Sequence, residues 1–240
     1  MKFSLASMGV TATWKFPRQH KNYFAEILNQ IRLRHILEMV MSHVDCEDTK
    51  TVLDVGCGNG AVSHVLAQVC QTVGIEIQKS YLKMRGKNGD LNFVMADIDG
   101  LPFKTGSFDL IVCASVLEHM LNLDSALMKL KSILKTNGIL FAGYPVETHL
   151  FKMIWRVVSP DEFKFIDQPQ TFFVNPDTQK LGDYWKNPMT HKQTYLSIRE
   201  GLDRHFRLVQ RVKLPFRFLP DITSYYECAE LISAPDRHVI

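Results

Sequence analysis

Hydrophobic positions change their spacing along the chain and so divide it into elements. Between Tyr23 and about Val44, apolar side chains recur at helical spacing, which predicts an amphipathic helix. From Thr51 onward, short and nearly continuous apolar runs alternate with helix-like segments, as is typical of parallel strands buried on both faces. The predicted strands are Thr51–Val55, Gln71–Ile77, Asn92–Ala96, Phe108–Ala114 and Gly138–Tyr144, and the predicted helices between them are Ala61–Val69, Gln78–Arg85 and Leu123–Lys135.

The order of these elements predicts the fold class. Strands that alternate with helices form a parallel sheet, and right-handed crossovers place the helices on both faces. Asn137 and Gly138 are a stop signal for the last of these helices. Farther along, His191–His205 is again helical in pattern, and Phe206–Leu214 and Ser224–Ile232 are two final strands that we expect to be antiparallel. The expected fold is α/β, a doubly wound and mostly parallel sheet of seven strands with an antiparallel C-terminal strand.

The segment 145–190 differs in composition from the rest. It holds five of the ten prolines and eight aromatic residues. Because so long a stretch is rarely a bare loop, we expect a folded, aromatic-rich insert after the fifth strand, acting as a lid over the substrate. Its aromatic side chains either form the core of the insert or line an apolar or sugar-binding site. The part Phe151–Val158 suits a packed helix or a helix lying on a membrane surface.

The length of 240 residues fits one domain, which we expect to span 1–240. Its expected parts are an N-terminal helical cap (1–50), a cofactor-binding core (51–144), the substrate insert (145–190) and a C-terminal helix with strands (191–240).

Charge and cysteine content narrow the classes of partner and compartment. Lysine and arginine number 28 against 25 aspartates and glutamates, and a net charge of +3 does not favour a nucleic acid as partner. The five cysteines form no C-x-x-C pair, which favours a reducing, cytoplasmic setting and argues against a zinc site; we expect no bound metal. No run of about 18 apolar residues is present, so we expect no transmembrane helix.

A glycine-rich turn after the first predicted strand is the strongest candidate for chemistry. Asp54 precedes three glycines at alternate positions, Gly56, Gly58 and Gly60, and Cys57 lies between the first two. Glycine lets the backbone approach a ligand without a Cβ in the way, and the following helix points its N-terminus at that ligand. The G-x-G-x-G spacing differs from the G-x-G-x-x-G of dinucleotide-binding turns, so a nicotinamide-dependent oxidoreductase is disfavoured.

With this turn the chain resembles the class I S-adenosylmethionine-dependent methyltransferases, whose first motif is an acidic residue followed by G-x-G-x-G. The resemblance covers Thr51 to about Tyr144. It implies a Rossmann-like sheet and S-adenosyl-L-methionine as the cofactor, with the residues from Asp54 to Gly60 around its methionine part.

Two further strand ends match the same family. Glu76 ends the second predicted strand and Asp97 the third. The resemblance implies that Glu76 accepts hydrogen bonds from the ribose hydroxyls and that Ile77 packs on the adenine. It also implies that Asp97 accepts from the adenine amino group and that the backbone N–H of Ile98 reaches a ring nitrogen.

The fourth strand runs on into Leu117-Glu118-His119, which resembles the group that includes ubiquinone, sterol and sugar O-methyltransferases. The resemblance places Ala114 and Ser115 in the cofactor site and His119 near the methyl group. His119 is therefore the candidate catalytic residue, either as a base that takes a proton at neutral pH or as a side chain that positions the cofactor. We expect Glu118 to point away from His119.

Three other residues have two interpretations each. Arg34 lies on the helix that covers the cofactor in the family, and is either a partner of the methionine carboxylate or a surface arginine. His149 and His191 flank the insert, and each is either a surface or capping histidine or a contact of the substrate.

These observations lead to a functional hypothesis with alternatives. The hypothesis is methyl transfer from S-adenosylmethionine to an oxygen of a small or lipid-linked acceptor, such as a sugar or quinone, by in-line displacement. A membrane surface remains open as a partner, and no nucleic acid is expected. N- or C-methylation and a non-catalytic S-adenosylmethionine-binding regulator are the alternatives. The large aromatic insert counts against the regulator, because a protein without a substrate has no need of a lid.

Overall fold

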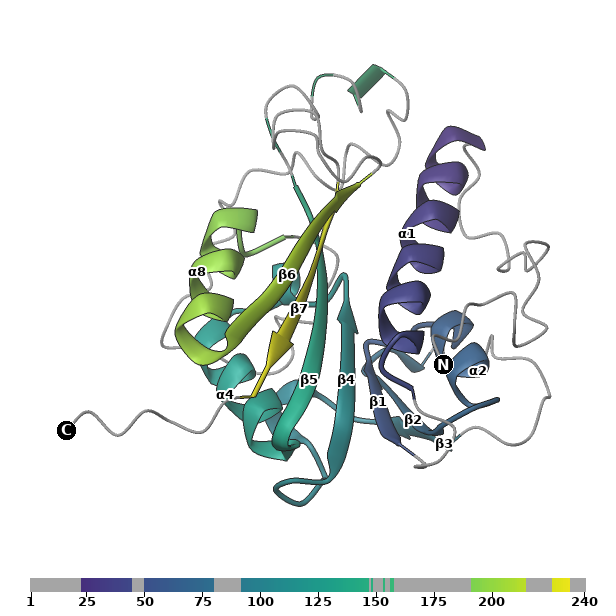
Figure 1. Cartoon of the computed structure of the whole chain (residues 1–240). Helices are drawn as coiled ribbons and strands as arrows, with labels where there is room; N and C mark the ends of the chain where they lie inside the picture. Colours follow the sequence, from purple (N-terminus) through teal and green to yellow (C-terminus); the bar gives the residue numbers. More distant parts are fainter. Residues whose placement is uncertain are drawn as a thin grey trace.

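A computed structural model describes residues 23–44, 50–79, 92–146, 148, 153, 156–157, 191–214 and 226–233 of the chain (Figure 1). Within these ranges the helices are α1 (Tyr23–Met41), α2 (Ala61–Leu66), α4 (Leu123–Ile133) and α8 (Tyr195–His205), with the 3-10 helices η1 (Ile98–Gly100) and η2 (Leu117–His119). The strands are β1 (Thr51–Val55), β2 (Gln71–Glu76), β3 (Asn92–Met95), β4 (Phe108–Ala114), β5 (Leu134–Pro145), β6 (Arg207–Leu214) and β7 (Tyr226–Ile232).

The seven strands form one sheet in the order β3-β2-β1-β4-β5-β7-β6. The pairings among β1 to β5 are parallel, and β7 pairs antiparallel with both β5 and β6. The expected α/β fold, a mostly parallel seven-stranded sheet with an antiparallel C-terminal strand, is thus confirmed. Chain order reverses between β1 and β4, so the carboxyl ends of these two strands form the switch point where such sheets bind ligands.

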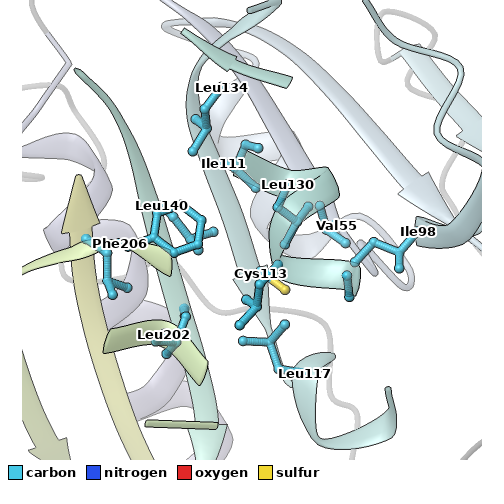
Figure 2. Close-up of a cluster of buried hydrophobic side chains, with 14 of the residues drawn as sticks. Val55, Ile98, Ile111, Cys113, Leu117, Leu130, Leu134, Leu140, Leu202 and Phe206 are labelled. Carbon is cyan, nitrogen blue, oxygen red and sulfur yellow. The ribbon is translucent and has the colours of Figure 1, made fainter. Parts of the chain in front are cut away.

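Helices cover both faces of the sheet. Neighbouring side chains of each strand point to opposite faces, so a strand that is apolar throughout has to be covered on both. Leu53 of β1 belongs to the buried cluster that contains α4 and α8, whereas its neighbour Val52 belongs to the cluster that contains α1 and α2. Figure 1 shows the two helix pairs on opposite sides of the sheet. The cluster on the α4 and α8 side is drawn in Figure 2, where Leu130 and Leu202, both fully buried, represent the two helices. This burial on both faces explains why the strands are almost continuously apolar.

The end of α4 corrects one prediction. The helix stops at Ile133 rather than at Lys135, and β5 begins at Leu134. The strand register then jumps, since Phe108 pairs with Leu134 but Leu110 pairs with Ile139. Asn137 adopts a positive φ of 62° inside this irregularity. The Asn-Gly signal therefore marks a bulge in β5 and not the end of a helix.

Two predicted elements fall mainly outside the described residues. They are the helix Gln78–Arg85 and the aromatic insert 145–190, and the division of the chain into four parts remains a prediction with them. Among the described helices, none combines the length and the hydropathy that crossing a bilayer requires.

Candidate functional site

The glycine turn after β1 is held in a left-handed backbone conformation. Gly56, Gly58 and Gly60 have φ angles of 65°, 54° and 82°. The N–H of Gly60 donates to the carbonyl of Cys57 at 2.8 Å, and the N–H of Cys57 donates to the carbonyl of Ile75 in β2 at 3.0 Å. Left-handed φ angles favour glycine, so the three alternate glycines are required by the shape of the turn.

Two of these glycines have opposite surroundings. A Cβ on Gly56 would lie 2.4 Å from a methyl group of Val116, so this position is closed by the segment after β4. A Cβ on Gly58 would meet nothing within 4 Å. The turn is therefore packed against the protein at Gly56 and open at Gly58, as a backbone cradle for a ligand must be.

Asp54 lies beneath the turn and not on its open side. Its carboxyl group is buried and accepts a hydrogen bond from the Ser63 hydroxyl of α2 at 2.5 Å. Burial raises the pKa of the Asp54 carboxyl to about 7. Asp54 thus ties the first turn of α2 to the end of β1, which sets where the helix N-terminus points. Cys57 is also buried, and burial raises the pKa of its thiol well above the usual range.

Glu76 ends β2 directly behind the turn. One carboxylate oxygen accepts from the N–H of Gly58 at 3.0 Å and the other from the N–H of Gln78 at 2.8 Å. The side chain is buried, and Ile77 beside it is half-buried. The carboxylate is thereby fixed next to the open glycine, where a ligand hydroxyl can approach its remaining lone pairs.

Asp97 and Ile98 follow β3. The carboxylate of Asp97, half-buried, accepts from the N–H of Asp99 at 3.1 Å and so caps η1. The side chain of Ile98 belongs to the hydrophobic core, so only its backbone is available to a ligand.

At the end of β4, the predicted site residue Ser115 contacts two residues, Arg32 and Tyr226, that the sequence did not reveal. Ser115 has a φ of 57° and donates its N–H to the carbonyl of Gly143 at 2.8 Å. Its hydroxyl oxygen accepts from Arg32 of α1 at 2.9 Å and lies 3.0 Å from the hydroxyl of Tyr226 on β7. The Arg32 guanidinium also lies over the Tyr226 ring, 5.2 Å from its centre. Ala114, before Ser115, is half-buried.

The arginine of α1 that reaches the strand ends is Arg32, two residues before the one considered from the sequence. Arg34 is exposed and lies 3.8 Å from Glu38 on the same helix, so it is a surface arginine. No local pattern separates Arg32 from Arg34, because the direction each side chain takes depends on how α1 docks on the sheet.

His119 lies at the end of η2 and is half-buried. Its ring lies 5.0 Å from the ring of His191, centre to centre, although the two residues flank a long stretch of chain. The expectation that Glu118 points away is wrong, because its carboxylate lies within 4.8 Å of ring nitrogens of both histidines. His149, the other histidine beside the insert, lies outside the described residues.

A cavity of about 300 Å³ lies at the opposite end of the strands from the glycine turn. Lys50, Asp109 and Lys135 line it, all at the amino ends of strands. Ligands of open α/β sheets bind at the carboxyl ends of the strands, so we place the functional site at the glycine turn and not in this cavity.

Comparison with known proteins identifies this arrangement. Residues 53–142 match the family model of a methyltransferase domain. The ubiquinone biosynthesis O-methyltransferase of Rickettsia canadensis (strain McKiel) is 31% identical over 120 residues, which cover 47% of this chain and 50% of the relative. The chain thus spans about half the length of that relative. An uncharacterized protein of Methanocaldococcus jannaschii is 28% identical over 220 residues, covering 82% of this chain and 94% of that protein.

A solved structure shows the same fold at low sequence identity. The magnesium protoporphyrin IX methyltransferase of Synechocystis PCC 6803, solved with bound S-adenosylhomocysteine, superposes with a TM-score of 0.61 at 16% identity and covers 90% of each chain. The family match lies over β1 to β5 and contains the glycine turn, Glu76, Asp97 and the end of β4. Residues 53–142 of the chain thus form a methyltransferase domain of the class I S-adenosylmethionine-dependent type.

Proposed function

We propose that this chain transfers the methyl group of S-adenosylmethionine to an oxygen atom of a small or lipid-linked acceptor, such as a quinone precursor or a sugar. The observation that carries the cofactor assignment is the turn at Gly58, which is left-handed, open, and backed by the Glu76 carboxylate. The oxygen acceptor is supported by the relative from Rickettsia, a ubiquinone biosynthesis O-methyltransferase.

The residues present fit the cofactor in chemical type. Gly58 has no Cβ to fill the open side of the turn, so the backbone there can lie against a ligand. The Glu76 carboxylate is an acceptor for ribose hydroxyls, and Asp97 with the backbone of Ile98 are an acceptor and a donor for adenine. Ile77 supplies an apolar surface for the purine ring. We infer that Arg32, held beside Ser115, pairs with the carboxylate of the amino acid part.

When bound, S-adenosylmethionine supplies an electrophilic methyl group on a sulfonium. The part of the chain is then to hold the acceptor in line with that group, to exclude water, and to remove the proton of an acceptor hydroxyl. His119 is half-buried at the end of η2, beside the switch point of the sheet, and is the candidate base that removes this proton. The alternative role of His119 is to position the cofactor.

Calorimetric titration with S-adenosylhomocysteine tests the cofactor assignment, with NADH as the control ligand. Micromolar binding of the nucleoside without binding of NADH supports the proposal. Binding of NADH alone would overturn it. Turnover on a panel of quinone precursors, sugars and amines then separates O-methylation from N-methylation, and binding without any turnover favours a regulatory protein.

The role of His119 is separated by one variant. We expect His119→Ala to lower turnover by about 100-fold or more while leaving the affinity for S-adenosylhomocysteine unchanged, because general-base catalysis contributes on that scale. His205→Ala is the matched control, since His205 lies on α8 and contacts Asp124 at 2.8 Å instead of the strand ends. Weaker nucleoside binding with normal turnover would assign His119 to positioning.

A further inference from the structure

Three potential metal ligands meet at the end of η2, next to the proposed methyl-transfer site. Glu118, His119 and His191 each offer one ligand atom, and these atoms all lie within 4.8 Å of one another. Glu118 is 2% exposed and both histidines are half-buried.

The cluster is held together by the backbone and not only by side-chain contact. The carbonyl oxygen of Glu118 accepts from the N–H of Lys192 at 2.6 Å and from the N–H of Gln193 at 3.0 Å. The Gln193 side chain donates to the carbonyl of Met120 at 2.9 Å. These three hydrogen bonds fasten the segment before α8 along η2. They fix the position of His191 next to His119.

The spacing suits a metal ion after a small closure. In a tetrahedral zinc site the Zn–N bonds are about 2.0–2.1 Å, which places neighbouring ligand atoms about 3.3 Å apart. The three ligand atoms therefore have to approach by at most about 1.5 Å, which side-chain rotation of the two half-buried histidines can supply. Two imidazoles and one carboxylate favour a transition metal of the zinc, cobalt or iron type over magnesium, which prefers oxygen ligands.

We propose that Glu118, His119 and His191 form a binding site for one divalent transition-metal ion, with coordination positions left for a further ligand. Three protein ligands with an open position are the usual composition of a catalytic rather than a structural zinc site. The sequence shows no sign of this site, since it contains no C-x-x-C or paired-histidine spacing. The reason is that the third ligand, His191, comes from beyond the insert.

The use of the ion rests on the proposed function, whereas its binding does not. An ion at this place would hold an oxygen of the acceptor and lower the pKa of its hydroxyl group, so that the proton leaves to water and the oxygen keeps the electron pair. In that case His119 is a metal ligand, and this role replaces the role as a base considered above, because an imidazole nitrogen bound to a metal cannot also take the proton of the acceptor.

Binding of Co²⁺ tests the site directly. Untagged full-length protein, freed of metal with a chelator, is titrated with Co²⁺ and followed by its visible d–d absorption, and with Zn²⁺ by calorimetry. We expect one equivalent to bind per chain. His119→Ala and His191→Ala should each weaken binding by at least about tenfold, since even the loss of an outer-shell partner costs that much. The control His205→Ala should bind as the wild type does.

Glu118→Gln keeps the size of the buried side chain and tests the third ligand should an alanine variant not fold, as judged by circular dichroism. Weakened Co²⁺ binding in this variant supports the site. Absence of Co²⁺ and Zn²⁺ binding to the wild type, or binding that is equal in the wild type and the His191→Ala variant, would overturn the proposal. Titration of the same proteins with S-adenosylhomocysteine keeps the two hypotheses apart: nucleoside binding without metal binding refutes the metal site alone, and metal binding without nucleoside binding refutes the cofactor alone.

Discussion

At the scale of single residues, the site depends on where a side chain is absent as much as on where one is present. Gly58 is left-handed and open, and its N–H is fixed by Glu76. Gly56, two residues earlier, is closed by Val116. The same residue type thus has two functions in one short motif, close packing at the first glycine and ligand access at the second.

We expect Gly58→Val to abolish binding of S-adenosylhomocysteine in a calorimetric titration, because the new side chain strains the backbone and occupies the open side of the turn. Gly106→Val is a matched control. Gly106 also has a positive φ, 66°, and open surroundings, but it lies in the turn before β4 at the opposite edge of the sheet. Equal loss of affinity in both variants would mean that backbone strain, and not ligand contact, is responsible.

At the scale of elements, α1 and α8 contribute to the site through the way they dock. α1 lies against one face of the sheet so that Arg32 reaches Ser115 and Tyr226, while Arg34 stays at the surface. α8 is anchored by Glu227, which is fully buried on β7 and accepts from Arg199 of α8 and from Tyr144 of β5. Because α8 begins at Tyr195, shortly after His191, this anchor also supports the proposed metal site.

The two arginines of α1 provide a comparison within one helix. We expect Arg32→Ala to weaken binding of S-adenosylhomocysteine by roughly 2 kcal/mol, the usual contribution of hydrogen bonds to charged groups. Binding of 5′-methylthioadenosine, which lacks the amino acid part, should be unchanged, and Arg34→Ala should change neither. If both ligands lose affinity in Arg32→Ala, the arginine holds α1 in position and does not bind the carboxylate of the ligand.

The ion pairs of α8 allow a second comparison. Glu227→Ala should lower the free energy of unfolding by about 1–3 kcal/mol in urea denaturation, because it leaves the fully buried Tyr144 hydroxyl without its acceptor and removes a charged partner of the half-buried Arg199. Asp124→Ala removes a partner of Arg204, which lies on α8 like Arg199. Both side chains of the Arg204–Asp124 pair are half exposed. Solvent screens that pair, so its loss should leave the urea midpoint unchanged. A small effect at Glu227 would show that water reaches the Tyr144 hydroxyl once the carboxylate is gone.

At the scale of the whole molecule, a buried carboxyl links stability to pH. The pKa of Asp54 is about 7 in the folded protein because of burial, against about 3.9 in an unfolded chain. Between these values the folded state holds the additional proton, so the free energy of unfolding falls as the pH rises. The full difference corresponds to roughly 4 kcal/mol.

Urea denaturation at pH 5 and pH 8 measures this dependence. We expect wild-type protein to be less stable at pH 8 and Asp54→Asn, which keeps a hydrogen-bond acceptor for Ser63 but cannot ionise, to lose most of the difference. The exposed Asp99→Asn variant should retain the wild-type dependence. The same dependence in Asp54→Asn as in the wild type would assign it to other groups.

The sequence by itself determined the strands, their parallel pairing and the glycine turn. These features are local, since a buried strand needs a continuous apolar run and a left-handed turn needs glycine at φ angles that other residues avoid. Gly56, Gly58 and Gly60 could therefore be placed in order with Glu76 and Asp97, each at a strand end. Where local signals compete, prediction was less accurate: Asn137 and Gly138 suit a bulge as well as a helix end, and only the register between β4 and β5 decides between them.

Only the tertiary structure decided which distant side chains meet at the strand ends. Arg32, Ser115 and Tyr226 come from three elements, and no spacing along the chain brings them together. The contact of His119 with His191 depends on the hydrogen bonds that fasten the segment before α8 to η2. The physical reason is that a periodic pattern specifies which face of an element is buried but not how that element is rotated and shifted on the sheet, which packing alone determines.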